Sequence, residues 1–436
     1  MNTGRLDYVY LFSLPLVAAL ASFAGIGVRL PGLGLLRHTG LMWLLTLFVG
    51  ILLLVFFRNG RKVTFPWWCW LPFFAWSLIS LQWSDMNPEY NIRLGVQMMV
   101  IPLIGLIASF SIISVRDVEG MNTAWILSML FIGAVCCYFM IGPGQEIQGQ
   151  AKGNYTGFAE RPAGASLLFI GGFFLAQFRK RPVFSTVLWA ITFVFCIISG
   201  GRMVSALLLV CWVVHPKLSS IGAKVAVVGF VCLVAVAAFN TPIIQQRFFN
   251  EAGGHAGHGS VDDVASGNFD SSGRFDAWPK ILREAHRRPI FGHGLGNSAP
   301  FTYKVWAPMD KPHNDYLKVY FESGVIGLAF FGLGLLGTLL NQLYVMAESD
   351  RLGIENWPAS AAIMGLASFA LLAVVDNPLV LGINFLHPLF AMVGAANAIC
   401  YNAKMGLAES SDDAVLKLKE AQPAEPAARP ALVPLR

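Results

Sequence analysis

The sequence predicts an all-α, polytopic membrane protein with about twelve transmembrane helices. Of its 436 residues, 56% are hydrophobic and only 13% are charged, whereas ordinary soluble domains carry about 25% charged residues. The mean hydropathy is +0.60. Apolar runs of roughly 17–25 residues, which are long enough to cross a bilayer, recur along the chain. These observations place most of the chain within a membrane.

The predicted spans follow one another from the N-terminus to residue 401. They are 8–27, 38–57, 66–83, 94–115, 122–142, 163–178, 183–199, 203–214, 222–239, 316–345, 358–375 and 379–401. The segment 203–214 is short and the segment 379–401 contains polar residues, so eleven or thirteen spans also fit. The join "SGGR" between 183–199 and 203–214 is either a tight turn or a break in one helix.

The distribution of Lys and Arg predicts the orientation. Ten of these residues lie in the short loops after every second span, and six lie in the short loops on the other side. Because short cytoplasmic loops are enriched in Lys and Arg, both termini are expected in the cytoplasm. Residues 1–401 then form the membrane domain, and the tail 402–436, rich in Ala, Pro and charge, is expected to be disordered.

Charge and cysteine content limit the classes of function. The net charge of +6 fits topology control and anionic lipids better than nucleic acid. The seven cysteines lie within or beside apolar runs without metal-ligand spacing, which favours small buried hydrophobic residues. Nucleic-acid binding and a cysteine-based metal site are therefore not expected.

The segment 240–315 is predicted to be a large loop on the non-cytoplasmic side. It carries eight Lys and Arg residues, which suggests an anionic ligand, although a solvated surface or lipid headgroup contacts would also account for them. Within it, 250–273 is rich in Gly, Ser and Asp and reads as a flexible surface segment. His255 and His258 have the spacing of a metal-binding pair, but no third ligand stands nearby, so a metal site is not favoured.

A short amphipathic helix is predicted to begin near Arg274. Ser272 is a candidate N-cap, and Pro279 lies early enough in the helix to be tolerated. The residues that fit one apolar face are Phe275, Trp278, Ile281, Leu282 and Ala285. A basic helix of this kind can simply lie in the headgroup plane, but Arg274 at its start is the better candidate for a specific role.

Two further residues stand where the chain meets the membrane. Arg202 lies between two apolar runs, where an arginine either extends to headgroups or faces a cavity or ligand. His313 directly precedes the span 316–345, and Asn314 and Asp315 after it could cap that helix or orient the imidazole.

"GHGLGN" reads as a glycine-rich turn rather than a phosphate loop, because no strand precedes it.

Several of these stretches closely resemble the signature block of the O-antigen ligase and polymerase family. They are "SGGR" at 199–202, "SGR…W" at 272–278, "RRPIFGHGLGNS" at 287–298 and "PHNDYLKVYFESGVIGL" at 312–328. The resemblance implies a multi-spanning GT-C-type glycosyltransferase of the bacterial inner membrane whose active site faces the periplasm. Such enzymes transfer glycans from a polyprenyl diphosphate carrier without a metal, a nucleotide sugar or another cofactor.

The resemblance also implies roles for individual residues. Arg202 and Arg274 match essential arginines of the family, His313 matches its essential histidine, and Arg288 lies within the matching block. The arginines are expected to bind the diphosphate, because a guanidinium pairs with phosphate oxygens through two hydrogen bonds. His313, supported by Asn314, is expected to act as the general base on the acceptor hydroxyl.

The preferred member of the family is an O-antigen ligase, which moves O-antigen from undecaprenyl diphosphate to lipid A–core oligosaccharide by an inverting displacement. An O-antigen polymerase or a protein O-oligosaccharyltransferase of the same family is the alternative. A transporter or flippase is less favoured, because charged residues gather in the predicted outer loops rather than deep within helices. Asp376 and Asn377 in "VVDNPL" are the exception, at a predicted outer turn.

Overall fold

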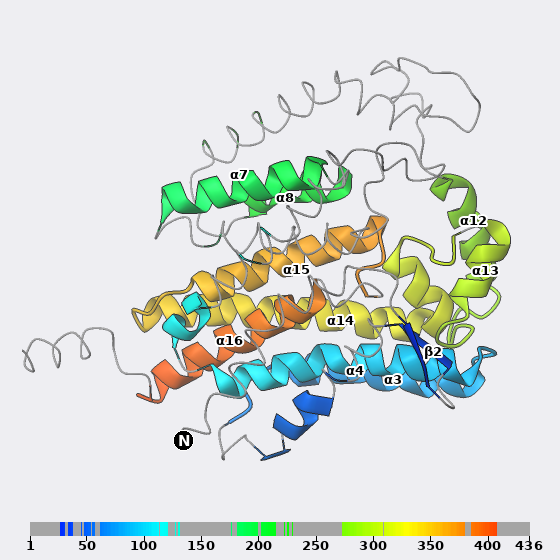
Figure 1. The fold of residues 1–436 in the computed structure, drawn as a ribbon, viewed down its shortest axis with the longest axis horizontal. Helices are drawn as coiled ribbons and strands as arrows, with labels where there is room; N and C mark the ends of the chain where they lie inside the picture. Colours follow the sequence, from blue (N-terminus) through cyan, green and yellow to red (C-terminus); the bar gives the residue numbers. More distant parts are fainter. Residues whose placement is uncertain are drawn as a thin grey trace, which may run out of the picture.

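Long helices that run side by side make up most of the structure, a computed structural model (Figure 1). It describes residues 27–30, 34–37, 45, 48–53, 55–56, 62–112, 114–120, 127, 130, 176, 181–198, 202–214, 222, 225, 229, 273–307, 309–379 and 385–407. The helices are α3 (Trp67–Ile79), η2 (Ser80–Trp83), α4 (Pro88–Ser111), α7 (Pro182–Ile198), α8 (Arg202–Val214), α12 (Arg274–Ala285), α13 (Ser298–Val305), α14 (Asp315–Arg351), α15 (Trp357–Val375) and α16 (Leu386–Lys404).

The predicted all-α class is confirmed for the described chain except for one short hairpin. Strands β1 (Gly27–Leu30) and β2 (Gly34–Arg37) pair antiparallel, with Gly27 opposite Arg37 and Leu30 opposite Gly34. The sequence did not predict this hairpin, because its first strand begins at the end of the apolar run 8–27.

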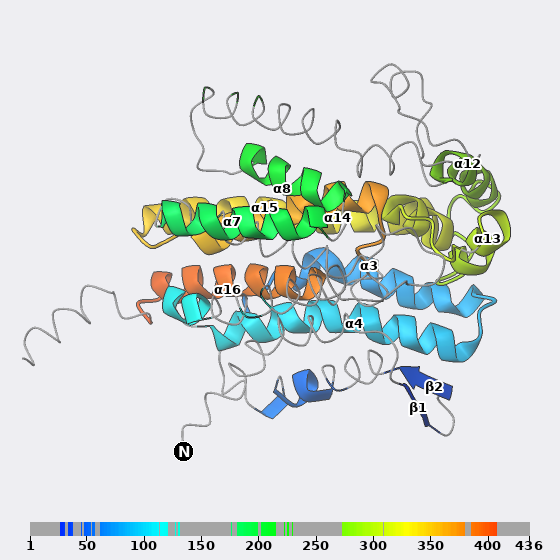
Figure 2. The same ribbon diagram turned by 45° about the horizontal axis from the view of Figure 1, so that its top comes forward.

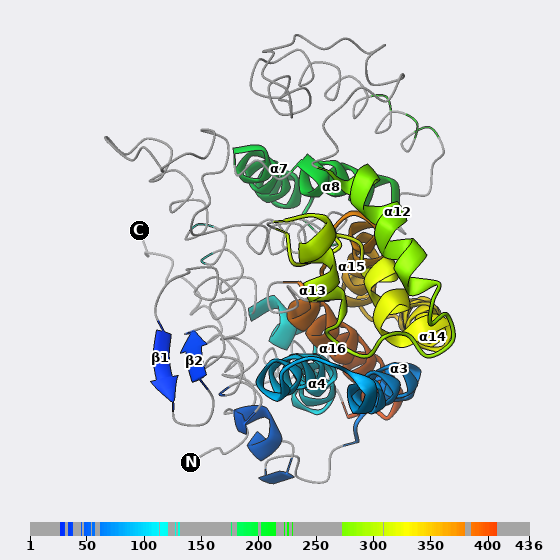
Figure 3. The same cartoon turned by 90° about the vertical axis from the view of Figure 1, so that its right-hand side faces the viewer.

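The described helices form three groups when viewed along the bundle (Figure 3). Helices α7 and α8 lie on one side and α3 and α4 on the other, while α14, α15 and α16 lie between them. The short helices α12 and α13 gather at one end of the bundle (Figure 2), which is called the α12/α13 end below. This end contains the residues that the sequence marks as functional.

An aromatic cluster fills the middle of the bundle. The Trp70 ring centroid lies 5.2 Å from that of Phe390 and 6.1 Å from that of Phe331, so one side chain joins α3, α14 and α16. Its Nε1–H donates to Thr338 Oγ1 at 2.7 Å. Packing and interhelical hydrogen bonds of this kind hold membrane helices together, since lipid tails are as apolar as the side chains.

Several predicted spans correspond to described helices with altered bounds. In the described part of the chain, three helices are long and apolar enough to cross a membrane: Leu94–Ser111, Asp315–Arg351 and Trp357–Val375. Helix α4 begins before its predicted span, at Pro88, and α14 continues to Arg351. The predicted span 379–401 is wrong at its start, because α16 begins only at Leu386.

The total of twelve spans stays a prediction. The segments 8–27, 122–142, 163–178 and 222–239 lie almost entirely outside the described residues, as does part of 38–57 and nearly all of the tail 402–436. Residues 199–201 of the "SGGR" join lie outside the described residues, and separate helices, α7 and α8, stand on either side of it. Trp189 Nε1–H of α7 donates to the Leu208 carbonyl of α8 at 3.3 Å, so the two helices pack against each other.

Candidate active site

The break in α14 organises the α12/α13 end. Gly324 has φ of 66° and divides the helix into a short first segment and a long second one. A side chain at this position would place its Cβ 2.0 Å from the Ile290 carbonyl oxygen. Glycine is therefore required both by the left-handed backbone and by the close approach of the loop.

The glycine-rich loop satisfies the backbone groups that the break exposes. His293 N–H donates to the Phe321 carbonyl and Gly294 N–H to the Glu322 carbonyl, each at 2.8 Å, while Val325 N–H donates to Pro289 at 2.8 Å. A buried unpaired backbone group would cost free energy, so loop and helix break depend on each other. These amides are thus occupied within the protein, which agrees with reading "GHGLGN" as a turn rather than a phosphate loop.

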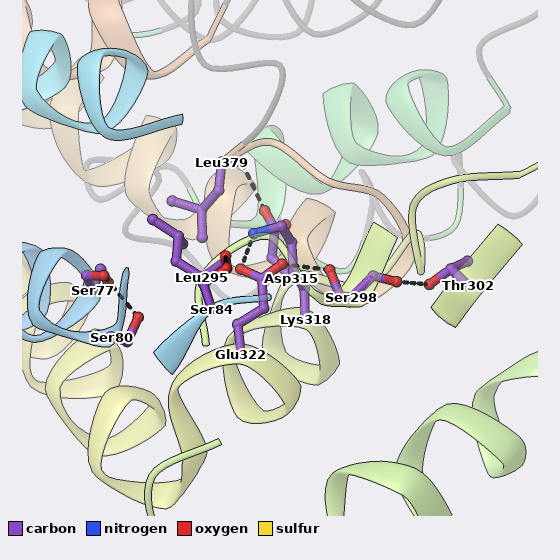
Figure 4. Close-up of polar contacts among 10 residues, drawn as sticks. All are labelled: Ser77, Ser80, Ser84, Leu295, Ser298, Thr302, Asp315, Lys318, Glu322 and Leu379. Atoms are coloured by element: carbon purple, nitrogen blue, oxygen red, sulfur yellow. Dashed lines mark hydrogen bonds and ion pairs between the residues drawn. The ribbon is translucent and has the colours of Figure 1, made fainter. Parts of the chain in front are cut away.

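A buried ion pair fastens α13 to the first segment of α14 (Figure 4). Lys318 Nζ lies 2.6 Å from Glu322 Oε2, and Ser298 Oγ donates to Glu322 Oε1 at 2.5 Å. All three residues are buried. Because a buried charge is costly unless it is paired and hydrogen-bonded, the three side chains hold each other in one arrangement.

Two side chains at the start of α14 fix the segment around His313. Asn314 is the N-cap, and its Oδ1 accepts from Leu317 N–H at 2.9 Å. Asp315 is fully buried, and its Oδ2 accepts from Leu379 N–H at 2.7 Å (Figure 4). Asn314 therefore caps the helix rather than orienting the imidazole, and Asp315 ties the chain after α15 to α14.

His313 lies at the meeting point of these segments. Its side chain is only 6% exposed, and its Nδ1 lies 3.1 Å from Asp376 Oδ1 and 3.0 Å from Asn377 Nδ2. His313 has φ of 52°, a conformation that non-glycine residues rarely adopt. The surrounding contacts, including those of the neighbouring Asp315, hold the backbone in this conformation, which is typical of functional positions.

The hydrogen bond to Asp376 defines the tautomer of His313. A carboxylate only accepts, so the pair requires a proton on Nδ1 and leaves the lone pair on Nε2. A protonated Nδ1 cannot accept from Asn377. With its amide turned so that Oδ1 faces the ring, Asn377 accepts from the same N–H, and that oxygen otherwise has no partner among the described residues.

Helix α12 brings Arg274 toward His313. Arg274 is the first residue of α12, and a Cβ added to the preceding Gly273 would lie 2.6 Å from Trp306 Nε1. The Trp306 ring in turn packs edge-on against the His313 ring, with centroids 5.6 Å apart. Trp278 Nε1–H also donates to the Pro312 carbonyl at 2.7 Å, so α12 is attached to the residue directly before His313.

The structure changes two details of the predicted helix. Gly273 occupies the N-cap position and no side chain caps the helix, while Ser272 lies outside the described residues. The buried face consists of Ala277, Ile281 and Ala285. Phe275 and Leu282, which the sequence predicts on the apolar face, are 57% and 41% exposed, because Ala277, Ile281 and Ala285 are the residues that pack in one buried cluster with Phe321.

Arg202 is the first residue of α8, and the packing of α8 against α15 determines the depth of Arg202 along the bundle. Cys211 of α8 contacts Ser368 of α15, with Sγ and Oγ 3.3 Å apart. The two helices run in opposite directions, and the start of α8 and the end of α15 both lie toward the α12/α13 end (Figure 1). At 1.5 Å per residue, Arg202 and Asp376 each lie about 11–14 Å from this contact toward that end, hence at similar depth.

Arg288 lies in a separate environment. It is exposed and lines a surface pocket together with Trp83 and residues 289–292, and neither His313 nor Arg274 is among the lining residues. The histidines His255 and His258 lie outside the described residues. Within the described ranges, no group of three or more His, Cys, Asp or Glu side chains is arranged to hold a metal ion.

Asp376 is the site residue that sequence reasoning missed. The sequence shows it only as a polar residue at a predicted outer turn, 63 positions after His313 in the chain. Its backbone leaves the helix at the C-cap of α15 in an extended conformation, and its Oδ1 accepts from Asn377 N–H at 2.9 Å. The "DN" pair after an apolar run is the only signal that could have suggested it.

Comparison with known proteins gives a match in the part of the chain that contains most of the candidate site. Residues 185–332 match the family model described as O-antigen ligase, a stretch that includes Arg202, Arg274, Arg288, His313 and Asn314. Asp376 lies beyond the matched segment. A search of curated proteins returned no match to the chain.

Proposed function

We propose that the chain is a glycosyltransferase acting as an O-antigen ligase, and the match of residues 185–332 to the O-antigen ligase family model supports this proposal. It transfers O-antigen polysaccharide from undecaprenyl diphosphate to lipid A–core oligosaccharide. The reaction takes place at the periplasmic face of the bacterial inner membrane, with both termini in the cytoplasm. The chain folds as a GT-C-type enzyme with about twelve spans.

One observation carries this proposal. A buried histidine, hydrogen-bonded through Nδ1 to Asp376, lies at one end of a bundle of membrane helices and beside the start of the helix that carries Arg274. An imidazole held in this way by a carboxylate is suited to accept a proton at Nε2. Its place at the end of the bundle suits a substrate whose carrier lies in the bilayer and whose glycan lies in water.

The arginines bind the leaving group in this mechanism. A diphosphate carries two or more negative charges, and the guanidinium groups of Arg202 and Arg274 stay charged at any physiological pH. As the sugar–phosphate bond breaks, its electron pair moves to the bridging oxygen, and fixed cations stabilise that growing charge. Two arginines can thereby supply the positive charge that a divalent metal provides in other phosphate chemistry.

His313 activates the acceptor. Nε2 takes the proton from a hydroxyl of the core oligosaccharide while that oxygen forms a bond to the anomeric carbon of the O-antigen. The carbon–oxygen bond to the diphosphate breaks in the same step, so the anomeric configuration inverts and undecaprenyl diphosphate leaves. Asp376 keeps the proton on Nδ1 and stabilises the imidazolium that forms, and Asn377 accepts from the same N–H.

Reconstitution of the purified protein with competing acceptors tests the proposal. Lipid-linked O-antigen is supplied together with lipid A–core, a second lipid-linked glycan and a pilin-like protein, in EDTA. Ligated lipopolysaccharide is expected as the main product. A product on the lipid-linked glycan would identify a polymerase, a product on the protein would identify an O-oligosaccharyltransferase, and a strict need for a divalent metal would refute the metal-free mechanism.

A further inference from the structure

An open pocket of about 390 Å³ lies beside the break in α14, away from His313. Trp83, at the end of η2, forms one wall, and residues 288–292 form the other. The Phe291 ring lies 5.9 Å from that of Trp76 and 6.4 Å from that of Trp83, between centroids. Ile290 and Phe291 are nevertheless 52% and 55% exposed, so the pocket is apolar and open to the outside.

The pocket lies where the lipid-facing side of α14 begins. Exposed apolar side chains follow one face of the second segment: Val325, Leu333, Leu336, Leu340 and Tyr344. From Val325 to Tyr344 this face measures about 28 Å at 1.5 Å per residue, close to the thickness of the hydrocarbon core, about 30 Å. Because Val325 N–H donates to the Pro289 carbonyl, residues 289–291 lie at the hydrocarbon boundary.

A cation stands at the headgroup side of this boundary. Arg288 is exposed and adjacent to Pro289, and no carboxylate in the described ranges forms an ion pair with it. Its neighbour Arg287 differs, because Arg287 Nη1 lies 3.0 Å from Glu284 Oε2. An unpaired guanidinium at the edge of an apolar pocket lined by Trp83, Ile290 and Phe291 is complementary to a lipid whose phosphate lies at the surface and whose acyl chain lies in the membrane.

We propose that the pocket of Trp83 and residues 288–292 binds the acyl-chain acceptor lipid through a phosphate on its headgroup, with Arg288 as the phosphate ligand. This inference rests on the proposed function, because the acceptor of that reaction is a phosphorylated glycolipid. The occupant is the acceptor rather than the polyprenyl donor, since Trp83 of the pocket ends η2, which directly follows α3, and α3 lies on the side of the bundle opposite α8, the helix that begins with Arg202 (Figure 3). The two lipids then approach His313 from opposite sides.

The test measures acceptor binding and transfer separately. Binding of lipid A–core to the purified protein in nanodiscs is measured without donor, using phosphorylated and enzymatically dephosphorylated acceptor. Wild type is expected to bind the phosphorylated acceptor about tenfold or more tightly than the dephosphorylated one, because the dephosphorylated acceptor cannot form the charge-assisted hydrogen bonds with the Arg288 guanidinium. Arg288→Ala is expected to lose this preference, and Arg287→Ala, the matched control, is expected to keep it.

Transfer assays give the second measurement. Arg288→Ala is expected to raise the KM for phosphorylated acceptor about tenfold and to leave the KM for donor unchanged, and Phe291→Ala, which removes an exposed ring, to raise the acceptor KM several-fold. A raised donor KM instead would overturn the proposal and assign Arg288 to the donor diphosphate. If Arg288→Ala transfers with an unchanged acceptor KM, the pocket proposal is overturned and the proposed function is not affected. If wild-type protein binds the acceptor in a phosphate-dependent way but shows no transfer, the pocket proposal is supported and the ligase function is refuted.

Discussion

Replacing Asp376 by Asn tests how the candidate base is held. The two side chains have the same shape, so the 3.1 Å contact with His313 Nδ1 can persist. Asparagine, however, can donate its amide N–H to Nδ1, which favours the tautomer with the proton on Nε2 and removes the lone pair that accepts the acceptor proton. We therefore expect the protein to fold normally and to lose catalytic rate.

The structure gives the size of this effect. The His313–Asp376 contact is a hydrogen bond to a charged group with little exposure, since the Asp376 side chain is 18% exposed. Such bonds contribute about 1.5–3 kcal/mol, which corresponds to a loss of roughly 10- to 200-fold in kcat at 1.36 kcal/mol per factor of ten. A tautomer that cannot accept the proton can only enlarge the loss.

The assay is transfer to lipid A–core by reconstituted protein, with donor binding measured in parallel. Asp85→Asn is the matched control, because Asp85 is an exposed carboxylate in the loop between η2 and α4. We expect Asp376→Asn to retain donor binding and to fall in kcat, while Asp85→Asn keeps both. Wild-type kcat in folded Asp376→Asn protein would refute the role given to this carboxylate.

Three other substitutions test the proposed role of Arg202 and the architecture of the α12/α13 end. Arg202→Lys keeps the positive charge but loses the paired N–H donors of the guanidinium, so the rate of glycan transfer should fall at least about tenfold. Unchanged activity would argue against bidentate binding of the diphosphate. Gly324→Ala places a Cβ 2.0 Å from a carbonyl oxygen at positive φ and should destabilise the fold by at least about 2 kcal/mol, measured as a lower Tm, whereas Gly332→Ala, with nothing within 4 Å, should not. Glu322→Gln leaves Lys318 buried without its partner and should cost about 3–5 kcal/mol; a Glu322→Gln protein as stable as one that also carries Lys318→Met would contradict this.

Local sequence patterns predicted the parts of the site that depend on nearby residues. Asn314 does cap the helix after His313, because capping preferences act over only three or four residues. A helix does begin at Arg274, but Gly273 rather than the predicted Ser272 stands at its N-cap. The apolar runs likewise predicted the long helices, since length and hydropathy suffice to identify a span. Their ends were less accurate, as the late start of α16 shows.

Contacts between distant segments could not be predicted in this way. Asp376 meets His313 only because α15 packs beside α14 and Asp315 accepts from Leu379 N–H. The spacing of Lys318 and Glu322 suits an ion pair on any helix surface, and only the packing of the loop shows that this pair is buried. Gly324 cannot be distinguished in the sequence from the other glycines of the predicted span. The helix breaks there only because amides of the distant glycine-rich loop satisfy the exposed backbone carbonyls.

His313→Ala tests whether His313 is the base that activates the acceptor hydroxyl. The measurement is single-turnover transfer from lipid-linked O-antigen to lipid A–core by reconstituted protein, with donor binding measured on the same preparation. We expect transfer to be abolished while donor binding by the arginines remains. Transfer at the wild-type rate in this variant would rule out His313 as the base.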